Sequence, residues 1–180
     1  MCKNINRLDN QQGSLISWLA GIIDGEGWVG LNRRFDKNRK GFTIAIQVSN
    51  TDPRILKKCD EILKHYYGIK CYFGKKIPKM NRQQSLHFWI VGIKIETLLR
   101  DLLPLCASKC SEISILLEYI DYKKPQLETY SERFNRFDYS KEEEFYRRLR
   151  QAREIRPLRD YTPVFPSQEG DIIQSTVKAD

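Results

Sequence analysis

The sequence predicts an α+β fold that is built from two pairs of β-strands and the helices around them. Three observations lead to this prediction. An apolar helix near the N-terminus is followed by two runs in which apolar and polar residues alternate. The order of one helix and two strands then recurs loosely, and helical patterns close the chain, so the expected order is α-β-β-α-β-β-α-α. Alternation of this kind is typical of strands that bury one face and expose the other.

The chain of 180 residues has the size of one domain with appendages. We divide it into an N-terminal arm (1–13), a core (14–122), a C-terminal helical extension (123–160) and a peripheral tail (161–180). No run is long enough to span a membrane, and the N-terminus has neither a secretory nor a transit pattern. We therefore expect a soluble, intracellular protein with no membrane partner, in the cytosol or an organelle matrix.

Charge is distributed unevenly along the chain. The net charge is +8, but residues 28–94 contain fifteen Lys and Arg against four Asp and Glu, which gives this block +11 and the remainder −3. Such a block is typical of proteins that bind phosphate groups of nucleic acids or of an anionic membrane surface, although a solvated basic face gives the same composition. Five cysteines without a Cys-x-x-Cys pair argue against a disulfide framework, and we expect Cys106 and Cys110 to be packing residues.

The first predicted helix carries the most informative feature of the chain. Ser14 is a suitable N-cap, an apolar run follows, and Gly25 and Gly27 mark the helix end. Glu26 is delivered just past that end, where the helix already carries partial negative charge. A cation beside Glu26 would explain this placement, and a divalent metal at a phosphodiester is the obvious candidate. The alternative is a glycine-capped buried helix with a solvated carboxylate.

The predicted strands and helices follow in order. Strands are expected at 28–35 and 42–50, joined by a turn at 36–41, and in the second strand Phe42, Ile44, Ile46 and Val48 share one face. Asp52-Pro53 opens a helix that ends near Gly68. The second pair of strands spans 70–77 and 85–92, with the basic segment 78–84 between them.

The C-terminal half is predicted to be helical. A helix at 94–103 is broken by Pro104, and a longer helix runs from 108 to 122, with Lys123-Lys124-Pro125 at its end. Ser140 and Glu143 form a capping box that opens a further helix. That helix either clamps a DNA backbone or flanks the core, and the sequence favours neither.

Residues 18–27, from Trp18 to Gly27, resemble the LAGLIDADG motif of homing endonucleases. Matching positions are Leu19, Ala20, Gly21, Ile23, Asp24, Gly25 and Gly27, and Glu26 falls on the metal-binding carboxylate of the family. The motif occurs once, which in that family goes with a homodimer. The resemblance implies that two motif helices pack in parallel across a twofold axis, and small residues would let them approach closely. The implied interface consists of Trp18, Leu19, Ala20, Gly21, Ile22, Asp24 and Gly25.

The resemblance also implies a LAGLIDADG-like αββαββα core and its catalytic residues. Glu26 and the backbone oxygen of Gly25 would bind the metal, which is expected to be Mg²⁺, with Mn²⁺ as an alternative and Ca²⁺ binding without supporting cleavage. Asn50, Arg54 and Lys109 fall where the family orients water and steadies the phosphate. Asp24 is assigned to capping and interface packing.

In the family, a four-stranded antiparallel sheet lies in the major groove of double-stranded DNA, where Arg and Lys suit guanine and Asn and Gln suit adenine. The candidate DNA-binding residues are Asn32, Arg34, Lys37, Arg39, Thr43, Gln47, Lys75, Lys76, Arg82, Ser85 and His87. Two positions depart from the expected pattern. Trp28 is bulky where relatives often have a smaller residue, and Arg33 interrupts the buried side of the first strand, which makes its register uncertain.

The resulting hypothesis is a homodimeric, site-specific endonuclease that makes double-strand breaks in a long, near-palindromic DNA target by means of metal-activated water. One alternative is a LAGLIDADG-like protein that binds DNA as a regulator, or intron RNA as a maturase, without cutting. Another is a basic structural protein that binds nucleic acids. Glu26, together with Asn50, Arg54 and Lys109 at the expected places, favours cleavage over the first alternative. The second alternative would not need a carboxylate at a helix C-terminus.

Overall fold

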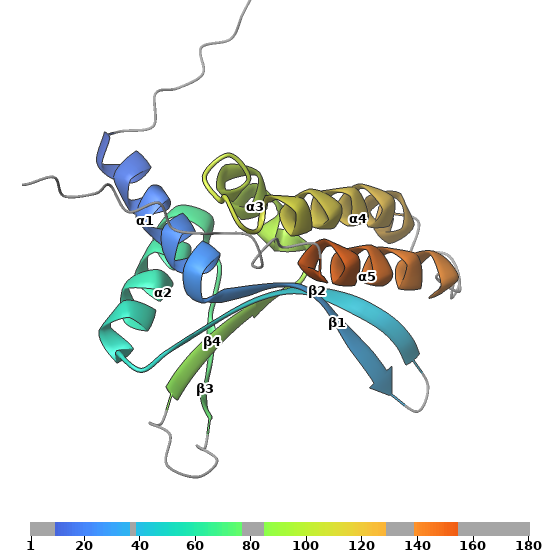
Figure 1. The fold of residues 1–180 in the computed structure, drawn as a ribbon, viewed down its shortest axis with the longest axis horizontal. Coiled ribbons are helices and arrows are strands. Elements are labelled where there is room, and N and C mark those ends of the chain that lie inside the picture. Colours follow the sequence, from blue (N-terminus) through green and yellow to red (C-terminus); the bar gives the residue numbers. More distant parts are fainter. Residues whose placement is uncertain (1–9, 37–38, 77–84, 129–138, 155–180) are drawn as a thin grey trace, which may run out of the picture.

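The computed structural model describes residues 10–36, 39–76, 85–128 and 139–154 (Figure 1). The elements, in order, are α1 (Asn10–Glu26), β1 (Gly27–Asp36), β2 (Arg39–Asn50), α2 (Pro53–Tyr67), β3 (Tyr72–Lys76), β4 (Ser85–Val91), the 3₁₀ turn η1 (Ile93–Ile95), α3 (Glu96–Leu102), α4 (Cys110–Glu128) and α5 (Tyr139–Glu154). The predicted α+β class and the two strand pairs are confirmed. No helix in the described part of the chain is long and apolar enough to cross a membrane.

The four strands form one antiparallel sheet in the order β1-β2-β4-β3. Figure 1 shows that the sheet is arched and that helices α1 to α5 lie on its convex side, so none of the described helices covers the concave side. We call the concave side the open face. The hairpin β1–β2 and the hairpin β3–β4 meet through β2 and β4, as expected for two half-buried pairs joined into a single sheet.

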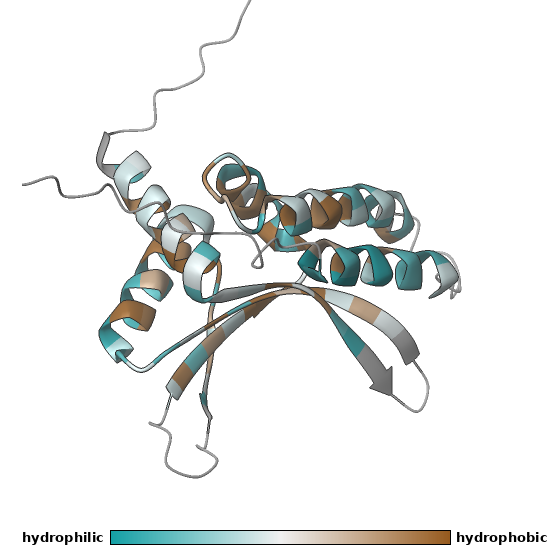
Figure 2. Ribbon diagram, in the orientation of Figure 1, coloured by the Kyte–Doolittle hydropathy of each residue, from teal (hydrophilic) through white to brown (hydrophobic). Residues whose placement is uncertain are grey.

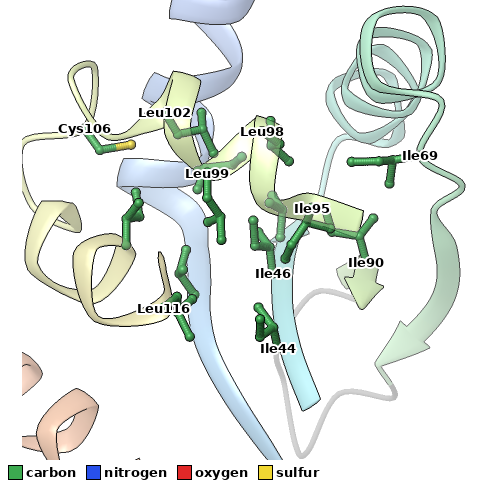
Figure 3. Packing of buried hydrophobic residues seen from close by; sticks show 14 of the residues in the cluster. Ile44, Ile46, Ile69, Ile90, Ile95, Leu98, Leu99, Leu102, Cys106 and Leu116 are labelled. Carbon is green, nitrogen blue, oxygen red and sulfur yellow. The ribbon is translucent and has the colours of Figure 1, made fainter. Parts of the chain in front are cut away.

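The core lies between the convex side of the sheet and the helices. Ile44 and Ile46 from β2 and Ile90 from β4 point toward α3 and α4, where Leu99 and Leu116 meet them (Figure 3). These five side chains are almost completely buried. Figure 2 shows hydrophobic and hydrophilic residues alternating along the strands, which is the pattern that the sequence predicted.

Two helix boundaries follow their sequence signals. The Asp52 side chain caps α2 by accepting a hydrogen bond from the Arg54 backbone N–H, and Pro53 occupies the first turn. Gly68 ends α2 in the left-handed conformation with φ of 61°, which glycine adopts without steric cost.

Other boundaries differ from the prediction. Helix α1 begins at Asn10, so Ser14 lies inside the helix and does not cap it. Helix α4 continues through Pro125 to Glu128 instead of ending at Lys123-Lys124-Pro125. Ion pairs of Lys123 with Glu142 of α5 and of Lys124 with Glu96 of α3 hold the turn before Pro125 in place. Tertiary contacts therefore outweigh the loss of one helical hydrogen bond.

Helix α5 flanks the core, which is one of the two roles that the sequence left open. It begins at Tyr139, so Ser140 lies within its first turn and does not cap it, and Glu143 pairs with Arg33 of β1. Phe145 and Leu149 pack into the core cluster. Arg33 also lies over the Tyr146 ring, 4.5 Å from its centroid. Arg33 thus belongs to the convex side, and the register of β1 is regular through it.

A buried polar group ties α5 to the end of β2. Before Ala45, the residues of β2 have no β4 partner on that edge. There the Phe42 backbone N–H donates to Glu142 Oε2 (3.1 Å), and the Phe42 carbonyl accepts from the Tyr119 hydroxyl (3.2 Å). Glu142 is 1% exposed and pairs with Lys123. Side chains of α4 and α5 therefore replace the missing strand at this edge.

The four described cysteines are all free thiols. Cys59, Cys71 and Cys106 are buried, and burial raises the pKa of Cys106 to about 11. Cys110 is exposed at the start of α4, so the prediction that it is a packing residue is wrong.

Candidate metal-binding carboxylate and nucleic-acid interface

Glu26 is the last residue of α1 and is exposed. Among the described residues, no hydrogen bond or ion pair occupies its carboxylate. The chain turns directly from α1 into β1 at Gly27, where a Cβ would collide with the backbone of Ile23. A Cβ on Gly25 would meet nothing within 4 Å. Glu26 therefore stands free at the junction between the helix and the sheet.

Asp24 faces its own chain and caps the start of α4. Its carboxylate accepts hydrogen bonds from the backbone N–H groups of Ala107, Ser108 and Lys109 at 3.0–3.2 Å and from the Ser108 hydroxyl at 2.9 Å. Burial alone would raise the pKa of Asp24, but these hydrogen bonds outweigh it and hold the pKa below its usual value. Asp24 thus fixes the end of α1 to the loop before α4 and is not a second free carboxylate.

Lys109 is 5% exposed and lies at the C-terminal end of α1. Its ammonium group donates to the backbone carbonyl of Asp24. A cation at a helix C-terminus offsets the negative end of the dipole. Lys109 therefore makes the end of α1 more tolerant of the Glu26 carboxylate two residues later.

Asn50 and Arg54 sit at the junction between β2 and α2. Asn50 Oδ1 accepts from the Asp52 backbone N–H (2.8 Å), and the Arg54 guanidinium pairs with the Asp52 carboxylate (2.7 Å) while remaining 89% exposed. Hydrogen bonds from Arg54 hold the pKa of Asp52 below its usual value. Both side chains thus hold Asp52, the residue that caps α2, and Arg54 remains accessible to a ligand.

The exposed side of α1 differs from the interface that the motif implied. Leu19 and Ala20 are fully buried in their own chain, so they cannot contact a second copy. The exposed positions of the helix form a stripe of small residues, which we call the α1 stripe: Ser14, Ser17, Gly21 and Gly25. Trp18 and Ile22 are partly buried beside it. A Cβ on Gly21 would meet no other atom within 4 Å.

Several predicted DNA-binding residues share the open face. Thr43 and Gln47 of β2 alternate with core residues that point to the convex side, so they face the open side. Asn32 of β1 is the strand partner of Thr43 and lies on the same face. His87 and Ser85 alternate in the same way along β4. These five residues are exposed or partly exposed.

Other predicted DNA-binding residues do not join this group. Lys75 pairs with Leu86 and lies on the convex side of the sheet, because strand positions alternate between faces. The backbones of Arg34, Arg39 and Lys76 belong to the sheet. Lys37 and Arg82 lie outside the described residues.

Sequence reasoning missed three aromatic side chains on the open face. Trp28, Trp89 and Tyr72 occupy this face at positions that the alternation could have identified, but only polar types were considered as DNA contacts. Arg153 of α5 lies over the Trp28 ring, 5.0 Å from its centroid. No local pattern indicated this contact, because 124 residues separate Arg153 from Val29, whose carbonyl accepts from its guanidinium.

The described part of a single chain does not contain a complete metal site. No group of three or more His, Cys, Asp or Glu side chains comes together there. The exposed Glu26 carboxylate and the Gly25 carbonyl, which lies among the last four carbonyls of α1, are nevertheless oxygen donors of the type that Mg²⁺ prefers. They fit such an ion if a second copy of the chain supplies further oxygen donors.

Comparison of the sequence with known protein families gives no match, and neither does a search of curated proteins. Solved structures do match. The homing endonuclease I-CvuI in complex with its target and Ca²⁺ has a TM-score of 0.55 and 20% identity, over 80% of this chain and 83% of that one. I-CvuI with the I-CreI target and Mg²⁺ has a TM-score of 0.51 and 22% identity, over 68% and 75%. The chain therefore has the LAGLIDADG homing endonuclease fold.

Proposed function

We propose that this chain is a LAGLIDADG endonuclease that cuts both strands of a long, near-palindromic DNA site as a homodimer. The observation that carries the proposal is the free carboxylate of Glu26 at the junction of α1 with the open sheet. A structural role would give this carboxylate a partner, as Asp24 has in the loop before α4. Within the described residues, no hydrogen bond or ion pair engages the Glu26 carboxylate, although it lies at the negative end of a helix.

The matching structures support a DNA substrate. I-CvuI was solved with DNA targets, once with Ca²⁺ and once with Mg²⁺, in which case the DNA was not cleaved. In our proposal the open face of this chain lies in the major groove, and the +11 charge of residues 28–94 attracts the phosphates. The open face supplies polar groups to the base edges, and the basic residues fix the position along the backbone.

Glu26 and the Gly25 carbonyl would hold the divalent metal together with their counterparts from the second copy. The bound ion would act as a Lewis acid and lower the pKa of a coordinated water. We propose Mg²⁺ as the cofactor, with Mn²⁺ as a substitute and Ca²⁺ as an ion that binds without supporting cleavage. Mg²⁺ usually binds to one or two carboxylates and keeps several waters, which suits a site with so few protein ligands.

The remaining residues would position the reacting groups. Lys109 holds the end of α1 through the carbonyl of Asp24, two residues before Glu26. Arg54 is 89% exposed, so it can turn from Asp52 to a phosphate at a modest cost, because exposed ion pairs are weak. Asn50 keeps the β2–α2 junction in shape through the Asp52 N–H.

We propose that two copies meet along the α1 stripe. Its four small residues would allow two backbones to approach closely, since interaxial distance depends on the side chains at the contact. The resulting dimer would bring two Glu26 side chains toward the same axis. Trp18, Ile22 and the capping residue Asp24 would flank this contact, whereas Leu19 and Ala20 would support it from the core.

The test is a cleavage selection on a randomised duplex library with Mg²⁺, using the wild type, Glu26→Gln and Glu61→Gln. Glu61 is an exposed glutamate on α2 with only a long contact to Lys57 (3.9 Å), so it is a matched control for loss of one carboxylate. We expect the wild type and Glu61→Gln to create ends flanked by a twofold-related sequence and Glu26→Gln to create none.

Two other results would contradict the proposal. If all three proteins cut equally, Glu26 is not a metal ligand. If all three bind duplex DNA or an intron RNA and none cuts, the chain is a binding protein or a maturase.

A further inference from the structure

Four residues form a continuous row across the open face. In the registers of the three strand pairs, Trp28 lies opposite Gln47, Gln47 opposite Trp89, and Trp89 opposite Tyr72. One residue of every strand is therefore present, and three of the four are aromatic. Tyr72 is 48% exposed, and the other three are partly exposed. We call this set the aromatic row.

Two glycines let the rings lie against the sheet. A Cβ on Gly30 would collide with the Trp28 ring and the Arg153 guanidinium, and a Cβ on Gly74 would lie 2.7 Å from His87 and 3.1 Å from Trp89. The rings of Trp89 and His87 are stacked at 5.3 Å, and those of Trp89 and Tyr72 at 6.0 Å. The row is thus held in place by contacts within the chain before any ligand arrives.

Arg153 holds the Trp28 end of the row. Its guanidinium donates to the Val29 carbonyl at 2.6 Å and lies over the Trp28 indole. Because Val29 belongs to the edge strand, α5 reaches the open face at this edge. The C-terminal extension thereby contributes to the orientation of a ring on the proposed DNA-binding surface.

The row also lies close to Glu26. Trp28 is two residues along the chain from Glu26, so their backbones are at most about 7 Å apart. Neighbouring strands are about 4.8 Å apart, so Trp28 and Trp89 are separated by about 10 Å, or about three base-pair steps. On the proposed complex, the row therefore meets the innermost base pairs of each half-site.

The chemistry of the row matches A·T base pairs. In the major groove, adenine offers N6 and N7 to a glutamine amide, and thymine offers its C5-methyl group to an apolar surface. A G·C pair offers no methyl group, and its acceptor pattern suits Arg or Lys better than glutamine. Gln47 is flanked on both sides by an indole, so an amide and apolar surfaces are available within the same few base pairs.

We propose that the aromatic row specifies A·T pairs at the innermost positions of each half-site, with Gln47 binding adenine and the two indoles covering thymine methyl groups. The proposal rests on the proposed function, since it requires duplex DNA on the open face. The competing possibility is that the rings form a platform on which the bases of a single strand stack. The duplex is favoured because Trp89 already stacks with His87 and Tyr72 and Trp28 lies under Arg153, so these ring faces are occupied within the chain, whereas a methyl group needs only part of a ring surface.

The experiment measures affinity for the selected duplex in EDTA, so that no cleavage occurs. One duplex series replaces the innermost thymines by deoxyuridine, which removes only the methyl group. Another replaces the innermost adenines by 7-deazaadenine, which removes the N7 acceptor. The proteins are the wild type, Trp89→Ala, Gln47→Ala and the control Phe73→Ala, which removes an exposed aromatic residue of β3 (52% exposed) that pairs with the core residue Phe88.

We expect deoxyuridine to weaken binding of the wild type about 4-fold for each methyl group that the indoles cover, since one buried methyl group is worth about 0.8 kcal/mol. Trp89→Ala should lose most of this sensitivity, and Phe73→Ala should keep it. The 7-deaza substitution should weaken the wild type about 5-fold or more and leave Gln47→Ala unaffected. Thermal unfolding of each variant shows whether it is folded.

Three results would overturn the proposal. Equal deoxyuridine sensitivity of the wild type and Trp89→Ala, or a selected site with G·C at the innermost positions, would refute the A·T assignment while leaving the endonuclease intact. Tighter binding to single-stranded DNA or RNA, lost in Trp89→Ala, would identify a stacking platform. Failure to bind any duplex would refute the proposed function as well.

Discussion

At the scale of single residues, two neighbouring carboxylates of the motif have opposite environments. Asp24 accepts hydrogen bonds from four groups of residues 107–109, whereas Glu26 has no partner among the described residues. Their positions in the helix explain this difference, because residues two apart point in different directions. Asp24 therefore secures the structure, and Glu26 remains available for a ligand.

The Asp24 cap should contribute measurably to stability. Asp24→Ala leaves the N–H groups before α4 without an acceptor, and we expect the free energy of unfolding to fall by about 1–2 kcal/mol. Urea unfolding at neutral pH measures this loss. Asp24→Asn keeps one acceptor oxygen, so its effect should be smaller.

The same residue predicts a pH dependence. Because the folded-state pKa of Asp24 is lowered, its ionic contribution is fully present above the unfolded-state value of about 4 and is lost as the pH falls through the folded value. The stability difference between the wild type and Asp24→Asn should therefore be constant above about pH 5 and shrink below pH 4. A difference that grew on acidification would contradict this assignment.

At the scale of elements, α5 acts as a cover for the β1–β2 hairpin. Glu142 binds the Phe42 N–H at the edge that β4 does not reach, and Lys123 from α4 balances its charge. Arg33 of the hairpin pairs with Glu143 of α5, and Arg153 of α5 donates to the Val29 carbonyl of the hairpin. Both interactions hold α5 against the hairpin. Helix α5 is therefore part of the fold.

Loss of Glu142 should be costly. Glu142→Ala leaves Lys123 without its buried partner and the Phe42 N–H without an acceptor, and we expect a loss of about 3 kcal/mol in urea unfolding. Hydrogen exchange should accelerate at the β1–β2 hairpin more than at β3. The double variant Glu142→Ala with Lys123→Met should be less destabilised than the sum of the single variants, because no charge then remains buried alone.

The sequence predicted the fold more completely than the site. Period-two alternation identified β2 and β4, and Asp52-Pro53 and Gly68 identified both ends of α2, because these signals are local. The prediction that a helix ends at Pro125 is wrong, because ion pairs with the distant residues Glu142 and Glu96 hold this helix and no local pattern reveals them. The burial of Leu19 and Ala20 and the contact of Arg153 with Trp28 likewise depend on packing between remote segments.

At the scale of the whole molecule, the proposed metal site requires a second copy of the chain. The Glu26 carboxylate lies at the junction between α1, which carries the α1 stripe, and the sheet, which carries the open face. In the described part of a single chain, no group of three or more His, Cys, Asp or Glu side chains comes together. A twofold dimer would double the carboxylates and extend the sheet surface. Obligate dimers of this kind couple assembly to activity.

The α1 stripe should be sensitive to side-chain size. Gly21→Leu should abolish the dimer, because the added side chain would hold two helices apart, and Gly21→Ala should weaken it less. Sedimentation equilibrium measures the dissociation constant. Lys57→Leu, which places the same side chain on the exposed face of α2, should remain dimeric. A Gly21→Leu protein that dimerises as well as the wild type would place the interface elsewhere.

The most direct test of the central claim compares the single-turnover cleavage rate of Glu26→Gln with that of the wild type on the selected DNA site in Mg²⁺. The account predicts a loss of about 10³-fold in rate, since metal-assisted stabilisation of the transition state is worth several kcal/mol and each 1.36 kcal/mol is tenfold. Binding of the site in EDTA should change by only a few fold, because Glu26 does not hold the DNA. Cleavage at the wild-type rate by Glu26→Gln would contradict the claim that this carboxylate holds the catalytic metal.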